Sequence, residues 1–384
     1  MILPTIQYAH RDIWNHTPNG RGPAFAGVEK IVRGQRVDLL VSTAFFATSP
    51  DKTAEVNYRV RTIRPDGTPG ATTDLLKLVP RGMVENNRMI RPAAQISSWG
   101  FDQTDSLGVW RFVVEVTDAV SGHVVTIERP LELCGDELLQ EPLPRGLGAS
   151  QWLGQYYQRP APQQLSAALK ALAVLLPAGR DAENGAVLGS FEQILADNPW
   201  LLPHLVKRLE GATGREQELL ATCLAFAKRD DLSFFQTLPD RAREAFMLRR
   251  VNHWPSPVPE PLQGAQLDVL WGRFFASGHF APLRELVGVL AYHPHKEALA
   301  NFRKLKQPPS PVPTEVQKSA VFGAAMWSLA SNIQHHKLVR DYCEGILLRR
   351  ELPGEQHVAL TAAFRIAMEN LQKAAPPAGE PRPH

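Results

Sequence analysis

One stretch, Thr314-Glu-Val-Gln-Lys-Ser-Ala-Val-Phe-Gly-Ala-Ala-Met-Trp-Ser-Leu-Ala-Ser-Asn-Ile333, decides how the second half of this chain folds. Prolines precede it, and Thr314 and Gln317 have the spacing of a capping box, so a helix is predicted. At helical spacing its apolar residues occupy two faces, the first with Val316, Ala320, Ala324 and Trp327, the second with Val321, Ala325 and Leu329. A helix that is apolar on two faces is buried between neighbours. The stretch therefore predicts a multi-helix domain, with backbones in close approach at residues 323–325.

Earlier in the chain the apolar period is two. Apolar residues alternate with others in 37–41, 54–62 and 110–116, which is typical of half-buried strands. The segment Arg64-Pro-Asp-Gly67 supplies a turn, in which Pro65 presets φ and Gly67 takes a positive φ. Strands joined by glycine and proline turns, with no helical period among them, predict an antiparallel β-sandwich of the immunoglobulin-like type.

From Gln163 onward the period is 3.6, beginning with a leucine stripe at 165, 169, 172 and 176. Ser190 and Gln193 fit a second capping box. Further helices are predicted at Arg215–Lys228, Asp240–Val251, Gln266–Ala276, Pro282–Tyr292, Lys296–Leu305, His336–Arg349 and Glu355–Gln372. The chain is thus expected to comprise an immunoglobulin-like sandwich at 1–135, a linker at 136–162, an irregular, α-solenoid-like helical domain at 163–373 and a disordered proline-rich tail at 374–384.

Two features suggest repeated helical hairpins. The motif Pro255-Ser-Pro-Val-Pro259 recurs as Pro309-Ser-Pro-Val-Pro313, and an amphipathic helix follows each copy. The segment Leu270-Trp-Gly-Arg-Phe-Phe-Ala-Ser-Gly-His-Phe280, followed by Leu283-Arg-Glu-Leu-Val-Gly-Val-Leu290, resembles the tetratricopeptide-like helical arrays of bacterial proteins. In the first half, Asp105–Asp118 resembles the penultimate strand of bacterial immunoglobulin-like modules. The helical resemblance implies a protein-binding scaffold, and it assigns no binding residue.

Composition excludes several classes of protein. A formal charge of +3 over 384 residues lacks the basic excess that a dedicated nucleic-acid binder needs. Cys134, Cys223 and Cys343 are widely spaced, and they indicate neither a disulfide framework nor a zinc knuckle. No apolar stretch approaches the roughly 18 residues of a transmembrane helix, and the N-terminus lacks a signal-peptide pattern. A cytoplasmic location is the default expectation, with a periplasmic or secreted one as the alternative if a signal was removed.

Motifs that would force a chemical mechanism are absent from the sequence, among them HExxH, G-x-S-x-G, GxxxxGK[ST] and paired CxxC. No catalytic residue, metal or cofactor is therefore assigned. The one concentration of possible metal ligands contains His293, His295, His335 and His336, with Asp341 and Glu344 shortly after. Because His335 and His336 are adjacent, their side chains diverge by about 100° on a helix, which favours a helix boundary over a shared metal ion.

Aromatic residues are the candidates for contacts with a partner. Trp152, Tyr156 and Tyr157 lie in the linker, where they cover the junction or form a contact patch. Trp271, Tyr292 and Trp327 fall in consecutive helices, where core packing is the alternative to a pocket. Trp99 and Phe101 lie in a glycine-containing loop and either bind a sugar or peptide or close the end of the sandwich.

The resulting hypothesis is a non-catalytic interaction or scaffold protein, which binds a protein or peptide through its helical array. The alternative is an enzyme or a carbohydrate or small-ligand binder. Its site would lie at the interdomain junction, at the sandwich loops around Trp99, or near His293, His295 and His335.

Overall fold

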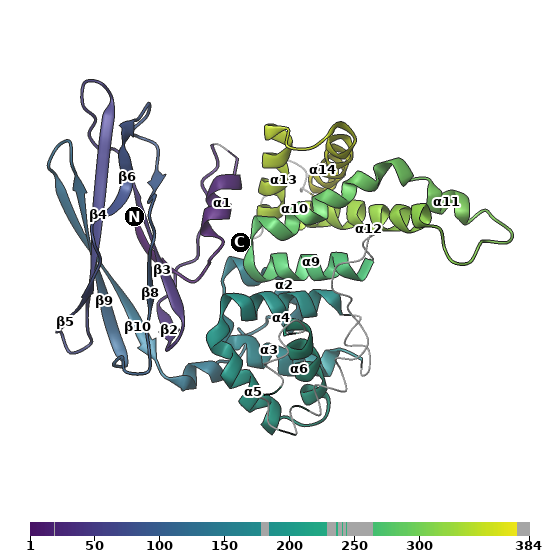
Figure 1. The fold of residues 1–384 in the computed structure, drawn as a ribbon, viewed down its shortest axis with the longest axis horizontal. Helices are drawn as coiled ribbons and strands as arrows, with labels where there is room; N and C mark the ends of the chain where they lie inside the picture. The colour runs from purple at the N-terminus through teal and green to yellow at the C-terminus, as the bar shows by residue number, and fades with distance from the viewer. Residues whose placement is uncertain are drawn as a thin grey trace, which may run out of the picture.

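The computed structural model describes residues 1–18, 20–177, 184–228, 236, 240, 243 and 264–374. Strands occupy the N-terminal part of the chain and helices the C-terminal part, as the change of apolar period predicted (Figure 1). Most of the predicted helix Asp240–Val251, the proline motif at 255–259 and residues 375–384 of the predicted tail lie outside the described residues.

The N-terminal strands form two sheets. In the first, β3 pairs with the three other strands: β1 (Ile2–Thr5), β3 (Arg36–Thr43), β7 (Arg91–Pro92) and β8 (Ser97–Gly100). The second has the order β2-β10-β9-β4-β5, with β6 also paired to β4: β2 (Lys30–Val32), β4 (Thr53–Ile63), β5 (Pro69–Thr72), β6 (Leu76–Met83), β9 (Gly108–Asp118) and β10 (Val124–Cys134). The β2–β10 pair is parallel, so the second sheet is mixed.

One apolar core lies between the two sheets, which form separate layers in Figure 1. Alternate residues of β3 and β4 contribute buried side chains to it, namely Val37, Leu39, Val41, Val56, Tyr58 and Val60. The hydroxyl of Tyr58 donates a hydrogen bond to the carbonyl of Gln95 at 2.7 Å, which satisfies its one polar group. Burial of one face of each strand thus explains the period of two in the sequence.

The rest of the chain is helical, and each predicted helix that falls on described residues is present with shifted ends. The α-helices are α1 (His10–His16), α2 (Ala149–Gln155), α3 (Leu165–Leu175), α4 (Gly185–Asp197), α5 (Leu202–Gly211), α6 (Gly214–Ala227), α9 (Gly264–Ser277), α10 (Phe280–Gly288), α11 (Ala298–Phe302), α12 (Thr314–His335), α13 (Lys337–Arg349) and α14 (Gly354–Ala374). Short 3-10 helices are η1 (Asp136–Gln140), η2 (Tyr156–Gln158), η3 (Pro162–Gln164), η5 (Pro199–Leu201) and η6 (Val289–His295).

Helix α9, rather than α12, is buried on two faces. Its residues Val269 and Ala276 belong to the apolar cluster of α2–α6, whereas Leu270, Trp271 and Phe274 belong to the cluster of α10–α14. Helix α9 therefore joins the two groups of helices, and Figure 1 shows it lying between them.

The predicted burial of α12 on both faces is wrong. The helix itself is confirmed at Thr314–His335, although Pro313 is its N-cap and the capping box predicted at Thr314 does not form. Its second face is buried at Val321, Ala325 and Leu329. On the first face Val316 is buried, but Ala320 and Ala324 are exposed and Trp327 is 75% exposed. Alanine and glycine suit a buried or an exposed face equally well, so the pattern could not show that this side faces outward.

Close backbone approach occurs between α4 and α9 instead of at 323–325. A Cβ added to Gly189 would lie 2.1 Å from the carbonyl oxygen of Val269, and one added to Gly272 would lie 2.1 Å from that of Ala186. The Ser190 hydroxyl donates a hydrogen bond to the carbonyl of Gly272 across the same contact, at 3.1 Å. Ser190 therefore lies inside α4, and the capping box predicted there is wrong.

Two single glycine-to-alanine variants test the close packing of α4 against α9. We expect Gly272→Ala to lower the free energy of unfolding by about 2 kcal/mol or more, because the methyl group meets backbone that cannot give way. Gly323→Ala on exposed α12 is the control, since no described atom lies within 4 Å of an added Cβ, and it should raise stability by up to about 1 kcal/mol. Denaturant unfolding followed by circular dichroism measures both, and equal effects would contradict this account of the α4–α9 contact.

Candidate functional site

The N-terminal segment packs into both parts of the molecule. Ile2 and Ile6 lie in the core between the sheets, whereas Ala9 and Ile13, at and within α1, are buried with residues of α9–α14. Helix α13 lies so close that a Cβ on Gly345 would be 2.8 Å from the carbonyl oxygen of His16. The division into 1–135 and 163–373 stays a prediction, and this segment contributes to the cores of both.

The carboxylate of Asp12 binds the amino-terminal end of α10. Its Oδ2 accepts the backbone N–H of Phe280 at 3.0 Å and lies 3.1 Å from Nδ1 of His279. The hydrogen bond to His279 lowers the pKa of Asp12, and the same bond raises the pKa of His279 against the opposing effect of burial. Because the first N–H groups of a helix lack partners within it, Asp12 caps α10 from a distant part of the chain.

A second ionic contact joins the loop after α1 to α13. Arg21 donates hydrogen bonds to Oδ1 of Asp341 at 3.1 Å and to both carboxylate oxygens of Glu344, at 2.6 and 3.2 Å. Lys337 pairs with the other oxygen of Asp341. Buried Asp341 thus has two cationic partners, and both carboxylates that the sequence suggests as possible metal ligands, Asp341 and Glu344, hold the N-terminal segment.

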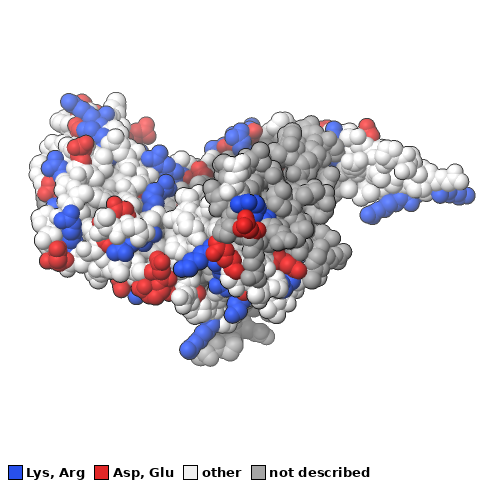
Figure 2. Space-filling view, turned by 60° about the horizontal axis from the view of Figure 1, so that its bottom comes forward, with Lys and Arg blue, Asp and Glu red and all other residues white. Residues whose placement is uncertain are grey.

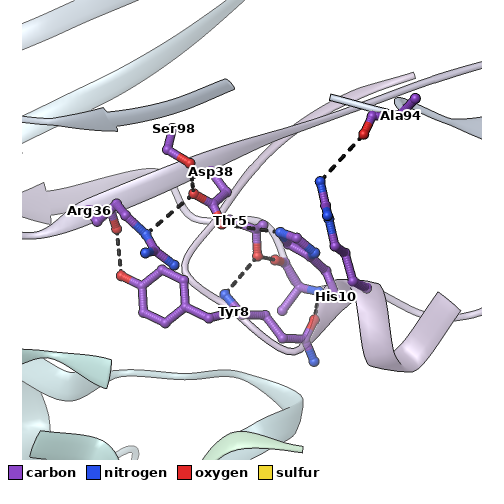
Figure 3. Close-up of polar contacts among 10 residues, drawn as sticks. Thr5, Tyr8, His10, Arg36, Asp38, Ala94 and Ser98 are labelled. Carbon is purple, nitrogen blue, oxygen red and sulfur yellow. Dashed lines mark hydrogen bonds and ion pairs between the residues drawn. The ribbon is translucent and has the colours of Figure 1, made fainter. Parts of the chain in front are cut away.

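The start of α1 is tied to the first sheet by the polar network drawn in Figure 3. Nε2 of His10 lies 3.1 Å from Oδ2 of Asp38, and the hydroxyl of Ser98 donates to Oδ1 of Asp38 at 2.6 Å. Arg36 lies 3.4 Å from the same Oδ1, and the hydroxyl of Tyr8 donates to the carbonyl of Arg36 at 2.6 Å. The carboxylate stands between the serine and the histidine, so the three residues do not form the nucleophile–base–acid order of a hydrolase triad. The network positions α1 on the sheet.

A cavity of about 710 Å³ opens at this junction. Its walls are the N-terminal segment, residues 157–160 and the first turn of α13, which bring apolar Ile13 and Leu338 together with Gln7, Arg159 and Lys337. The side-chain amide of Gln7 donates to the carbonyl of Tyr157 at 2.7 Å, and its carbonyl accepts the N–H of Ala26 at 3.2 Å, so the wall itself is hydrogen-bonded.

Most of the predicted partner-binding aromatics are core residues. Trp152, Tyr156 and Trp271 are buried, and Nε1 of Trp152 donates to the side chain of Gln164 at 2.9 Å. Tyr157 is also buried but lines the junction cavity, and its hydroxyl is hydrogen-bonded to Nδ1 of His336 at 3.3 Å. Among these four linker and α9 aromatics, the structure therefore brings one, Tyr157, to the wall of a cavity.

The remaining predicted aromatics lie apart from that cavity. Phe101 is buried and packs edge-on against Trp110, while half-buried Trp99 donates from Nε1 to the hydroxyl of Ser97 at 2.7 Å. Trp99 lies in strand β8, so the prediction that it lies in a loop is wrong, and both side chains pack with the core between the sheets. Tyr292 is half-buried, with Nζ of Lys318 5.5 Å from its ring centroid.

The predicted histidine group is dispersed. His335 ends α12, and its Nδ1 lies 2.8 Å from the carbonyl oxygen of Ser331, whereas His336 is the N-cap residue of α13. Burial lowers the pKa of His336 to about 4. Nδ1 of His293 lies 3.9 Å from Glu355, far along the chain from the other pair. No grouping of three potential metal ligands occurs among the residues that the structure describes.

The outward face of α12 is a surface that the sequence pattern assigned to the core. Exposed Trp327 lies there with Ala320, Gly323 and Ala324. Lys318 is the sole Lys, Arg, Asp or Glu between residues 316 and 335, and it faces Tyr292 instead of joining this surface. Because an uncharged face has the same pattern whether solvent or a helix covers it, no sequence signal marked Trp327 as accessible.

Comparisons with known proteins give little further information. No protein-family model matches the chain, and no curated protein matches it. A solved structure described as "pT26-6p" is similar at 10% sequence identity over 81% of this chain, with a TM-score of 0.15. The chain spans 47% of that structure's length, and at this TM-score the similarity carries no argument about fold or function. In the described part of the chain, every helix is too short or too polar to cross a bilayer.

The Asp12–His279 pair makes docking of the N-terminal segment depend on pH. The pKa of His279 is raised above 6.5, so its contribution is complete below that pH and is lost as pH rises through the folded-state pKa. The pKa of Asp12 is lowered below 3.8, so its contribution is complete above that pH and is lost as pH falls through the folded-state pKa.

We therefore expect Asp12→Asn to reduce the free energy of unfolding most between about pH 4 and pH 6.5, by about 1 kcal/mol given the partial exposure of the pair. Exposed Asp136→Asn is the matched control. Denaturant titrations at several pH values give the difference in the free energy of unfolding between wild type and variant. Because His336 is present in both proteins, its contribution cancels in this difference. A difference that does not change with pH would contradict the pairing.

Proposed function

We propose that this protein is a non-catalytic interaction protein, which binds a protein or peptide partner through the outward face of α12. The observation that carries the proposal is the 75% exposure of Trp327 on an uncharged helix face. Tryptophan is among the residues that contribute most to binding when a partner covers them. Depletion of charge is the compositional mark of the centre of a protein interface.

The neighbours of Trp327 suit a helical partner. Ala320, Gly323 and Ala324 are exposed, and no described atom lies within 4 Å of a Cβ added to Gly323. Small residues let a second backbone approach closely, while the indole ring supplies an anchor beside them. Figure 2 shows that the arm formed by α11 and the start of α12 projects from the body with mostly uncharged residues and Lys and Arg along one edge. The exposure of Trp327 and of these small residues makes the surface accessible to a partner.

The finer architecture belongs to the same proposal. We infer that the two sheets form an immunoglobulin-like sandwich, which the shared core between them supports. We also infer that the helices form an irregular, solenoid-like array, because α9 contacts α10, and α12, α13 and α14 contact one another. The resemblance of residues 270–290 to tetratricopeptide-like bacterial arrays is consistent with a scaffold role.

Photo-crosslinking tests the proposed surface. With a photoreactive amino acid at position 327 in the organism that encodes the protein, we expect one discrete crosslinked partner, and Trp327→Ala should weaken its recovery about tenfold or more. Position 348 in α13, where Leu348 is 68% exposed, is the matched control and should give no such product. Equal crosslinking at both positions, or undiminished recovery with Trp327→Ala, would remove α12 as the binding surface.

A second candidate function is small-ligand binding in the junction cavity. The specific observation is its volume of about 710 Å³ with Arg159 beside apolar Ile13 and Leu338, a combination suited to an apolar molecule with an anionic end, whereas the Lys337 side chain at the same wall is paired with Asp341. This candidate corresponds to the site expected at the interdomain junction.

An anionic apolar dye, anilinonaphthalene sulfonate, tests that candidate. We expect the folded protein to enhance the dye's fluorescence, and Ala24→Trp, which places a bulky side chain at the exposed cavity wall, to reduce dye affinity by about tenfold. Ala300→Trp in α11 is the control for an added surface indole. If both variants bind the dye as wild type does, the cavity is not the dye site and this second function loses its support.

A further inference from the structure

Four large apolar side chains are exposed on loops at one end of the strand region. Phe45 is 77% exposed, Met83 79%, Met89 55% and Ile90 59%. They lie in or beside the connections from β3 to β4 and from β6 to β7, at the end of the strands drawn uppermost in Figure 1. We name residues 44–52 and 83–90 the loop crest. Exposed apolar groups of this size gathered on neighbouring loops mark a contact surface.

The loop crest is an ordered structure. Its two loops lie side by side, since the N–H of Phe45 donates to the carbonyl of Asn87 at 2.6 Å and the side chain of Asn87 donates to the carbonyl of Phe46 at 2.7 Å. At the other end of these loops, the N–H of Val84 donates to the carbonyl of Lys52 at 2.9 Å. The apolar side chains are therefore displayed on a hydrogen-bonded frame.

The backbone itself is bent to present Phe45. Phe45 has φ of 58° and Lys52 has φ of 60°, both in the left-handed region that side-chain-bearing residues rarely adopt. Next to Phe45, Phe46 is buried in the core between the sheets. Such conformations cost free energy and persist where the surrounding structure enforces them, which occurs most often at functional positions. The turn keeps one aromatic ring inside while directing the next outward.

Three cationic side chains lie in the loop crest or next to it, Lys52 and Arg88 within it and Arg81 in β6 just before it. Lys52, Arg81 and Arg88 are exposed, and within the described part of the chain none of them has an ion-pair partner. The loop crest has two acidic residues, Asp51 and Glu85, and both are exposed; hydrogen bonds from Ser49 and Thr53 lower the pKa of Asp51. With Arg81 included, the surface has three cations against two carboxylates, so an apolar centre is combined with a small excess of positive charge.

We propose that the loop crest binds the surface of a bilayer that contains anionic lipids. Phe45, Met83, Met89 and Ile90 enter the boundary between headgroups and acyl chains, while Lys52, Arg81 and Arg88 contact lipid phosphates. Apolar insertion and electrostatic attraction to anionic headgroups are the two terms that hold peripheral proteins on membranes. This inference does not depend on the partner proposed for α12.

The charges favour lipid over a second copy of the chain. Two loop crests brought face to face would bring together two surfaces that each carry this excess of positive charge, which is unfavourable. An anionic bilayer supplies the opposite charge over its whole surface. It also accommodates loops that project beyond the strand ends, whereas a protein partner would need a hollow of matching shape.

Vesicle co-sedimentation of the full chain tests the proposal. We expect binding to vesicles of phosphatidylcholine with phosphatidylglycerol, at least about tenfold weaker binding to phosphatidylcholine alone, and weakening at high salt. Phe45→Asn with Met89→Ser should reduce affinity for the anionic vesicles by about tenfold or more, and asparagine tolerates the left-handed backbone at position 45. Arg81→Ala with Arg88→Ala should reduce it about tenfold while leaving the loop frame intact.

Leu348→Ser, which removes an exposed apolar side chain from α13, is the control and should bind as wild type does. Circular dichroism and thermal unfolding establish that each variant is folded, and the double arginine variant tests the surface even if the Phe45 variant is unstable. No binding to either vesicle, binding that ignores vesicle charge, or full binding by both loop-crest variants overturns the proposal. Loss of a protein contact in these variants without vesicle binding would assign the loop crest to a protein partner instead.

Discussion

The N-terminal segment has to pack into two cores at once, and the rest of the structure depends on this constraint. Ile2 and Ile6 are buried between the sheets, and only a few residues later Ile13 is buried among the helices. The carboxylate of Asp12 then caps α10 from outside, at 3.0 Å from the N–H of Phe280. Because the segment is covalently part of both regions, the strand region and the helices cannot turn freely against each other without exposing apolar surface.

The charged and polar side chains at the junction mainly hold the N-terminal segment in place. Asp341 is shared between Arg21 and Lys337, and Asp38 is shared between His10, Ser98 and Arg36. Against the effect of burial, hydrogen bonds from His10 and Ser98 lower the pKa of Asp38. The polar contacts at the junction therefore serve packing, and a cavity lies beside them. The accessible apolar groups lie elsewhere, on α12 and on the loop crest.

Aromatic residues illustrate how burial separates structural from functional roles. Trp271 and Trp327 both occur in helices that are rich in small and apolar residues. Helix α9 lies between two groups of helices, so Trp271 is core, whereas no described segment covers the outer side of α12, so Trp327 is exposed. The same side chain thus stabilises the fold in one helix and offers a binding surface in the other.

The sequence alone determined the change from strands to helices and the positions of most helices, because apolar periods of two and 3.6 are properties of local geometry. It also determined which face of β3 and β4 is buried, at Val37 and Val56 for example. The tertiary structure alone decided that α9 lies between the two groups of helices, that Ser190 bonds Gly272 instead of capping a helix, and that Phe45 points outward. Each of these depends on which distant segment lies alongside, and no local pattern records the presence or absence of a neighbour.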